Sequence, residues 1–196
     1  MEQTTAQEPA DAGSLPRSFE PYVLYELGVA SLTLNLAGGG SIDMTGTLAN
    51  GRSNYLLFEQ LVRDLIGLER TAGSDHVAAD GCRYEQKAYT DPQIDPAADL
   101  FQTSASSTFG ANNNGPKVKA FLEAGDYPGA LAICAATGYD HNDFYIYTNT
   151  RSYNPSVPFR FLIVPKVDVV GLLDASDPRL ISRSVVLGRV TRTERL

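Results

Sequence analysis

The sequence is poor in the side chains that bind transition metals. It contains two cysteines, Cys82 and Cys134, and two histidines, His76 and His141. A zinc site of four cysteines is therefore excluded, and a mixed site would need more His or Cys ligands than the chain provides. Two cysteines so far apart favour a reducing compartment over a disulfide framework, so we expect a cytoplasmic protein.

The sequence also lacks the long apolar runs of membrane proteins. No run approaches the ~18 apolar residues that cross a bilayer, and the acidic N-terminus lacks the basic start and apolar stretch of a signal peptide. Apolar residues make up 43% of the chain and charged residues 20%, which is typical of a globular protein. We expect a disordered tail over residues 1–19 and a single domain over residues 20–196.

Several common catalytic motifs are missing too. The glycine-rich segment 37–53 does not end in Gly-Lys-Ser/Thr, so it is no phosphate-binding P-loop and is predicted to be a loop. No Gly-x-Ser-x-Gly motif indicates a serine hydrolase. The segment Asp-His-Asn-Asp at 140–143 holds one His-Asn pair without the second histidine of an HNH-type nuclease.

Positive charge is scarce and unevenly placed. The net charge is -7, which argues against a chain that coats nucleic acid nonspecifically. Residues 1–110 hold 15 acidic and 6 basic side chains, whereas residues 111–196 hold 8 acidic and 10 basic ones. The C-terminal arginines are Arg179, Arg183, Arg189, Arg192 and Arg195. They fit either a solvated surface strand or an edge that contacts phosphates.

The clearest helix is predicted over residues 54–70, where leucines recur every three or four positions. Its apolar stripe consists of Leu57, Phe58, Leu61, Val62, Leu65 and Leu68. Ser53 or Asn54 can cap its start, and Glu59 lies beside the stripe, near the edge of the buried face.

The other elements follow from alternation and turn residues. They are a strand pair or a helix in 21–36, a hairpin at 74–89, a long polar stretch at 89–116, two short helices in 117–138, and strands at 143–150, 159–173 and 182–192. This order predicts a mixed α/β (α+β) fold with a central mixed sheet flanked by helices.

The hairpin at 74–89 carries an unusual set of charged residues. Its turn is predicted at Asp80-Gly81, and alternation places Arg83, Glu85, Lys87 and Tyr89 on one face and Tyr84, Gln86 and Ala88 on the other. Pairing about this turn brings Asp75 beside the Glu85–Lys87 region. His76 and Asp80 are predicted to lie outside the resulting cluster.

Two carboxylates and one amine form a set suited to phosphodiester hydrolysis. Hard oxygen ligands of this kind suit magnesium, which keeps positions for water and phosphate oxygens. A lysine can orient or deprotonate the attacking water and offset charge in the transition state. The alternative is an exposed strand edge with a Glu–Lys pair in solvent, which contributes little to stability.

The spacing of Asp75, nine residues and then Glu85-Gln86-Lys87 resembles the Asp…(Asp/Glu)-x-Lys pattern of the PD-(D/E)xK nuclease superfamily. The preceding helix with Glu59 and the order of helix, two motif strands, helix and further strands are also similar to that family, over about residues 54–150. Ser74 stands where many members have proline. The resemblance implies a restriction-endonuclease-like core.

The resemblance further implies a type II restriction endonuclease that acts as a homodimer on double-stranded DNA with Mg²⁺. Asp75 and Glu85 would bind the metal, Lys87 would position the attacking water, and Glu59 would support a second metal or hold Lys87. Cleavage would leave a 5′-phosphate, and a cognate methyltransferase would act on the same site without binding the nuclease. Two alternatives are a structure-specific resolvase or repair nuclease and a non-catalytic DNA-binding or accessory protein.

Two segments offer side chains that can contact DNA. Amides suit adenine edges, hydroxyls and lysines suit phosphates, and an arginine can be bidentate to guanine. The predicted contacts are Gln102, Ser104, Ser106, Asn112, Asn113, Asn114, Lys117, Lys119 and Arg151. The alternative for the first of these segments, 102–117, is a disordered surface loop.

Overall fold

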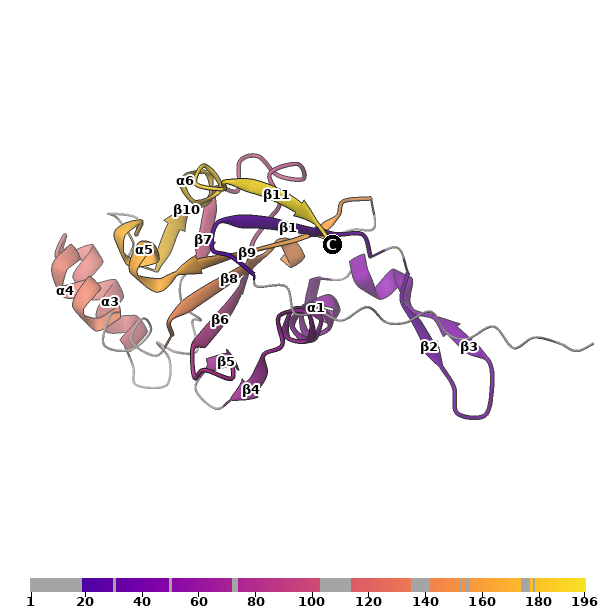
Figure 1. Cartoon of the computed structure of the whole chain (residues 1–196). Helices are drawn as coiled ribbons and strands as arrows, with labels where there is room; N and C mark the ends of the chain where they lie inside the picture. The colour runs from indigo at the N-terminus through magenta and orange to yellow at the C-terminus, as the bar shows by residue number, and fades with distance from the viewer. Residues whose placement is uncertain are drawn as a thin grey trace, which may run out of the picture.

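A seven-stranded mixed sheet forms the centre of the computed structural model, which confirms the predicted mixed α/β fold (Figure 1). The strands in spatial order are β11 (Arg192–Arg195), β1 (Val23–Leu27), β9 (Phe159–Pro165), β8 (Phe144–Thr148), β6 (Arg83–Ala88), β5 (Ser74–Val77) and β4 (Glu69–Thr71). The structure describes residues 19–29, 31–49, 51–71, 74–102, 114–134, 142–151, 153, 156–173, 177 and 179–196. The tail predicted over 1–19 lies outside them except for Phe19.

Alternation along the central strands gives the sheet two apolar faces. Tyr145 and Leu162 belong to one core cluster, whereas their neighbours Ile146 and Ile163 belong to the other. The first cluster is covered by α3 (Asn114–Glu123), α4 (Tyr127–Cys134), α5 (Lys166–Gly171) and α6 (Arg183–Leu187). The second is covered by α1 (Gly51–Ile66) and the short helix η1 (Thr45–Ala49). The central strands are therefore buried on both faces, as in other layered α/β domains.

Helix α1 confirms the predicted helix but is displaced toward the N-terminus, from 54–70 to 51–66. Within the helix, Phe58 and Val62 are the buried members of the predicted apolar stripe, whereas Leu57 is 40% exposed. Gly67 ends the helix with a φ of 75°, and the amide of Leu68 then bonds back to the carbonyl of Arg63. Leu68 is therefore buried beyond the helix and not on its stripe.

Asn54 does not cap α1, contrary to one of the two predictions. It lies inside the helix and is fully buried. Its side-chain amide donates to the carbonyls of Leu48 and Thr150, at 2.7 and 3.3 Å. Asn54 therefore ties α1 to η1 and to η3 (Asn149–Arg151), which follows β8.

The hairpin predicted at 74–89 is confirmed as the antiparallel pair β5–β6. Its loop has three residues instead of two, because Ala78 pairs with Cys82 and donates to its carbonyl at 2.8 Å. Gly81 closes the loop with a φ of 89°, a conformation that favours glycine. The register His76↔Tyr84 follows, and it sets Asp75 opposite Glu85 one step further along.

The connection from β6 to β8 passes through α3 and α4, and the two strands run parallel. Two short helices were predicted in this region, and α3 and α4 confirm them. The polar stretch predicted at 89–116 contains β7 (Leu100–Gln102), which pairs with β10 (Leu180–Ser182) in a small second sheet. Residues 103–113 lie outside the described part of the chain.

Two predicted strands are partly wrong. The strand expected at 159–173 ends at Pro165, and α5 follows at once. The strand expected at 182–192 is divided into the end of β10, helix α6 and a separate β11. Ser182 caps α6 by accepting a hydrogen bond from the amide of Val185, so the apolar run after it coils instead of extending.

The N-terminal segment, for which the sequence allowed either a strand pair or a helix, contains strands. The undecided segment 21–36 contains β1 and β2 (Thr33–Asn35). The predicted loop at 37–53 is wrong in part, because it contains β3 (Ser41–Asp43), η1 and the start of α1. Strands β2 and β3 form a hairpin that projects away from the sheet (Figure 1).

The C-terminal arginines do not share one environment. Arg183 is 3% exposed and donates to the carbonyls of Asp95 and Pro96 at 3.1 Å, so it fits neither alternative drawn from the sequence. Arg192 lies on the edge strand β11 and pairs with Glu20 and Glu194. Arg183 therefore secures the chain segment after β6, while Arg192 stays at the surface.

A buried ionic network fastens β9 to β1 and to the segment after β6. Nε of Arg160 lies 2.7 Å from a carboxylate oxygen of Glu26, and Nη1 lies 2.8 Å from Asp91. Asn149 also donates to Asp91, at 3.0 Å. The Asp91 side chain is 1% exposed, and these donors are the partners that a buried carboxylate requires.

Among the helices that the structure describes, none is long and apolar enough to cross a membrane.

Candidate functional site

The hairpin β5–β6 brings together the three residues that the sequence singled out. The register His76↔Tyr84, continued by one residue, sets Asp75 opposite Glu85, and Lys87 lies two residues further along β6. The amine of Lys87 forms an ion pair with Oε1 of Glu85. The two side chains are 10% and 17% exposed, so this pair lies in a largely buried setting and not on the solvated strand edge that was the alternative.

The carboxylate of Asp75 is held by the backbone of the neighbouring strand. Its Oδ2 accepts a hydrogen bond from the amide of Gln86 at 2.8 Å. The side chain of Gln86 in turn shares a 3.0 Å hydrogen bond with the ring of His76, and both residues are fully buried. Gln86 therefore connects β6 to β5 twice, beside the two carboxylates.

The strand register divides these residues between the two faces of the sheet. Glu85 pairs with Tyr145 on β8, whereas Gln86 pairs with Ile146. Residues that face each other across adjacent strands share a face. Glu85 therefore lies on the side of the Tyr145 cluster and Gln86 on the side of the α1 cluster. His76, which bonds to Gln86, lies with it and away from the carboxylates, in agreement with its predicted exclusion.

Glu59 is buried on α1, where its partner is another residue of the same helix. It is 8% exposed, and its Oε1 lies 3.4 Å from Nη2 of Arg63, four residues on. Glu59 was expected to hold Lys87, but the ion pair of Lys87 is with Glu85. The influence of Glu59 on the site is electrostatic: its charge raises the pKa of Glu85.

Tyr55 lies close enough to the carboxylates to feel their charge, and the sequence reasoning missed it. Burial raises the pKa of its hydroxyl, and the negative charges of Asp75, Glu59 and Glu85 raise it further. Tyr55 precedes Glu59 by one helical turn, so the i, i+4 spacing places both on one flank of α1. That spacing could have been recognised in the sequence. The position of Tyr145 beside Glu85 could not, because it depends on the parallel register of β6 and β8.

The pKa of Glu85 is raised first by burial and then by nearby negative charge. Burial raises it, the charge of Lys87 opposes that rise, and the charges of Asp75 and Glu59 add to it. A carboxyl whose pKa is raised on folding binds its proton more tightly in the folded chain than in the unfolded one. Stability is therefore lost as the pH rises from about 4.5 through the pKa of the folded state.

This sign predicts the behaviour of Glu85→Gln in the absence of divalent metal. The variant cannot ionise at this position, so its free energy of unfolding should rise relative to that of the wild type as the pH increases above 4.5. Urea unfolding at a series of pH values measures the difference. The same replacement at the exposed Glu123 is the control, and equal pH profiles for the two variants would contradict the assignment.

The donor set is compatible with one magnesium ion. Magnesium is bound by one or two carboxylates and keeps several waters. Asp75 and Glu85 each engage one carboxylate oxygen in the contacts above, which leaves the other oxygen of each. A divalent cation would also relieve the repulsion that raises the pKa of Glu85. Among the described residues no three His, Cys, Asp or Glu side chains come together as a metal site, so Glu59 is not a third ligand in this arrangement.

The predicted DNA contacts are only partly described. Lys117 and Lys119 are exposed on α3, where Lys119 lies 3.6 Å from Glu123, and Arg151 is exposed at the end of η3. Gln102 ends β7 and Asn114 begins α3, but their side chains lie outside the description. Ser104, Ser106, Asn112 and Asn113 lie outside the described residues altogether.

The lysines of α3 and Arg151 are not brought together in the fold. Helix α3 packs through Val118 against the cluster that contains Tyr145, whereas Arg151 follows the C-terminal end of β8. In the described part of the chain, these three predicted DNA contacts therefore lie on two separate elements, α3 and η3.

Comparisons of the chain with protein-family models, with curated proteins and with solved structures return no match.

Proposed function

We propose that the chain is a magnesium-dependent, sequence-specific endonuclease that hydrolyses phosphodiester bonds of double-stranded DNA. One observation carries the proposal: the carboxylate of Asp75 is bound to the amide of Gln86, the residue after Glu85, and Lys87 is paired with Glu85 in a largely buried setting. Burying two like charges and a cation costs free energy that an apolar hairpin would avoid. Such an arrangement is typical of a site that performs chemistry.

The order of elements supports the same proposal. Helix α1 precedes the strand with Asp75, the strand with Glu85 and Lys87 follows, and α3 and α4 lead on to β8. That succession is the one the nuclease resemblance implies. The parallel pairing of β6 with β8 places Tyr145 beside Glu85 and closes one side of the site.

Asp75 and Glu85 would hold the magnesium ion, which supplies charge stabilisation for a pentavalent phosphate and a lowered pKa for a bound water. The chain fixes Asp75 through the amide of Gln86, so its carboxylate needs little reorganisation. Glu59 adds negative potential from α1, where Arg63 keeps it in place.

Lys87 would act on the attacking water. Its amine, bound to Oε1 of Glu85, lies beside the carboxylates, where it can orient the attacking water and accept a proton from the water oxygen. In its charged form it offsets negative charge on the phosphate during attack. In-line attack by water leaves a 5′-phosphate in the nuclease family that the motif resembles.

Outside the hairpin, DNA contacts would come from exposed cations. Lys117 and Lys119 suit phosphates, and Arg151 suits a guanine edge. The remaining candidates, Gln102, Ser104, Ser106 and Asn112 to Asn114, extend the same readout. A homodimer working beside a cognate methyltransferase is part of this proposal.

The decisive experiment is incubation of the full chain with a long DNA of known sequence, with Mg²⁺ and with EDTA. We expect discrete fragments in Mg²⁺ alone. Cleavage restricted to branched or damaged DNA would replace sequence specificity with structure specificity. No cleavage of any DNA, together with no magnesium binding by calorimetry, would overturn the proposal in favour of a non-catalytic protein.

A further inference from the structure

The β2–β3 hairpin forms an arm, residues 32–44, that projects from the body of the molecule (Figure 1). Leu34 pairs with Ile42, so the two side chains share a face of the arm. All six strand residues of the arm are exposed. An isolated two-stranded hairpin is marginally stable in water, so an arm of this kind gains stability when its apolar face is covered.

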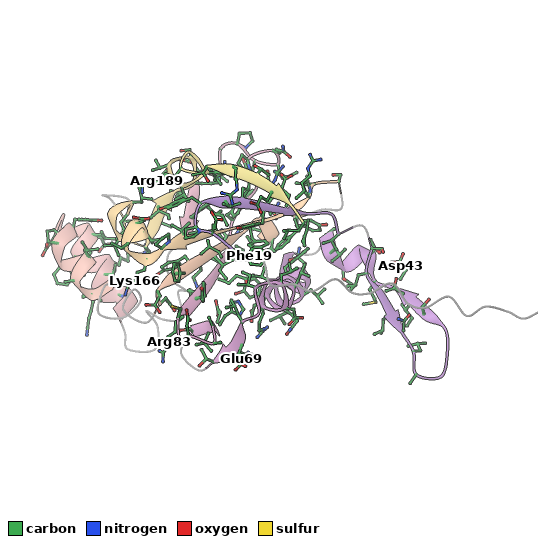
Figure 2. The ribbon with its side chains drawn as sticks, in the orientation of Figure 1. Phe19, Asp43, Glu69, Arg83, Lys166 and Arg189 are labelled. Atoms are coloured by element: carbon green, nitrogen blue, oxygen red, sulfur yellow. The ribbon has the colours of Figure 1, made fainter. Side chains whose placement is uncertain are left out.

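Alternation makes the arm amphipathic. Its apolar face carries Leu32, Leu34, Leu36, Ile42 and Met44. Its other face is polar, and includes Asp43 (Figure 2). Hairpins with one apolar and one polar face normally pack the apolar face against another element.

The base of the arm forms one wall of an apolar groove of about 500 Å³. The opposite wall is α1. The groove is lined by Leu32, Thr33, Leu34, Met44, Thr47, Leu56 and Leu57. We call the apolar face of the arm the ridge. The groove lies beside it, between the base of the arm and α1, so ridge and groove belong to one continuous surface.

Exposed apolar side chains are concentrated on this surface. In the described part of the chain eleven large apolar side chains are exposed, and five of them are here. They are Leu34, Leu36, Ile42, Leu56 and Leu57, with exposed fractions from 40% to 67%. Their combined exposed area is on the order of 400 Å², as large as the functional patches of typical monomers.

The charge pattern decides which kind of partner suits this surface. Between Gly28 and Gly51 the only charged residue is Asp43, whereas 20% of the whole chain is charged. Binding to DNA requires basic side chains for the phosphates, and this segment has none. Depletion of charge with exposed leucines is instead typical of the core of a protein–protein interface.

We propose that the arm and groove form a two-fold interface between two copies of this chain, with the arm of each copy seated in the groove of the other. In a two-fold interface the same surface serves both copies, and here one chain supplies both the ridge and the groove. Each copy carries a net charge of -7, and this near-neutral surface lets two copies meet without strong repulsion.

The area of the surface matches that of a stable dimer. A standard interface buries about 800 Å² per partner, of which a little over half is apolar. The exposed area of the apolar patch is close to that apolar share. Residues 1–18 suit the groove poorly as an alternative occupant, since their only large aliphatic side chains are Met1 and Leu15.

A homodimer is also part of the proposed function, but this interface rests on the arm and groove alone. Its test uses no DNA, so its failure would leave the proposed nuclease activity standing. Sedimentation velocity of the full chain from 1 to about 100 µM, a range that spans typical specific dimers, should show a species of twice 21.1 kDa. Leu34→Gln on the ridge and Leu56→Gln in the groove wall should each weaken the dimer at least tenfold. Both positions are more than half exposed, so the fold should be retained.

The matched controls are Val167→Gln, at an exposed apolar side chain of α5 outside the arm and groove, and Asp64→Asn on the exposed side of α1; both should leave the dissociation constant of the dimer unchanged. Far-UV circular dichroism checks the fold of every variant. A wild-type chain that stays monomeric throughout the range would overturn the proposal. So would a dimer that persists unaltered in both leucine variants, since its contact would then lie elsewhere.

Discussion

Lys87→Ala is expected to lower the rate of magnesium-dependent DNA cleavage by about 10²- to 10⁴-fold, the contribution of a well-placed acid or base. DNA affinity should stay within a factor of a few, because Lys87 is 9% exposed and is bound to Glu85 instead of lining the surface. Single-turnover cleavage measures the first quantity, and fluorescence anisotropy with Ca²⁺ in place of Mg²⁺ measures the second.

Two companion variants separate chemistry from structure. Lys119→Ala removes an exposed lysine that also pairs with a glutamate. As a proposed phosphate contact it should weaken DNA binding, but the cleavage rate of fully bound DNA should not change. Lys87→Arg keeps the positive charge beside Glu85 but cannot give up a proton near neutral pH, so it should restore stability without restoring the rate. Cleavage at the wild-type rate by Lys87→Ala would remove Lys87 from the mechanism.

Arg160→Met is expected to lower the free energy of unfolding by about 3–5 kcal/mol, the usual cost of removing one partner from a buried ionic network. The replacement leaves the carboxylates of Glu26 and Asp91 without their guanidinium, and the Asp91 side chain is 1% exposed. Urea unfolding followed by circular dichroism measures the change in midpoint.

Arg192→Met is the matched control, because Arg192 also pairs with two carboxylates. Its partners are Glu20 and Glu194, but its side chain is 45% exposed. Exposed pairs typically contribute less than about 1 kcal/mol, so this variant should unfold close to the wild-type midpoint. Similar losses for both arginines would mean that burial does not decide the strength of the Arg160 network.

Local patterns in the sequence were sufficient for the elements whose cause is local. The leucine period predicted α1, although its start was missed because Gly51 and Arg52 carry no apolar signal. The Asp80-Gly81 pair predicted the hairpin. The three-residue loop was not foreseen, yet that extra residue sets Asp75 opposite Glu85 and not opposite Gln86.

Features that depend on contacts between distant parts of the chain could not be predicted from the sequence. Arg183 reads as a surface cation, yet it is buried because three carbonyl groups of the segment after β6 surround its guanidinium. Strand 159–173 reads as one apolar run, and nothing local marks the change to α5 except Pro165. For the site, alternation predicted the Glu85–Lys87 face, whereas the pairing of Glu59 with Arg63 required the side-chain geometry.

The position of β1 in the sheet has a consequence for how the chain folds during synthesis. Tyr25 pairs with Phe161 on one side and with Glu194 on the other, so both partners of this early strand are made last. Contacts so distant in sequence form slowly, because a long loop must close before they yield any stabilisation. Asp75 and Glu85, by contrast, meet within one hairpin. During synthesis, the hairpin with Asp75 and Glu85 can therefore form before β9 and β11, the two partners of β1, have been made.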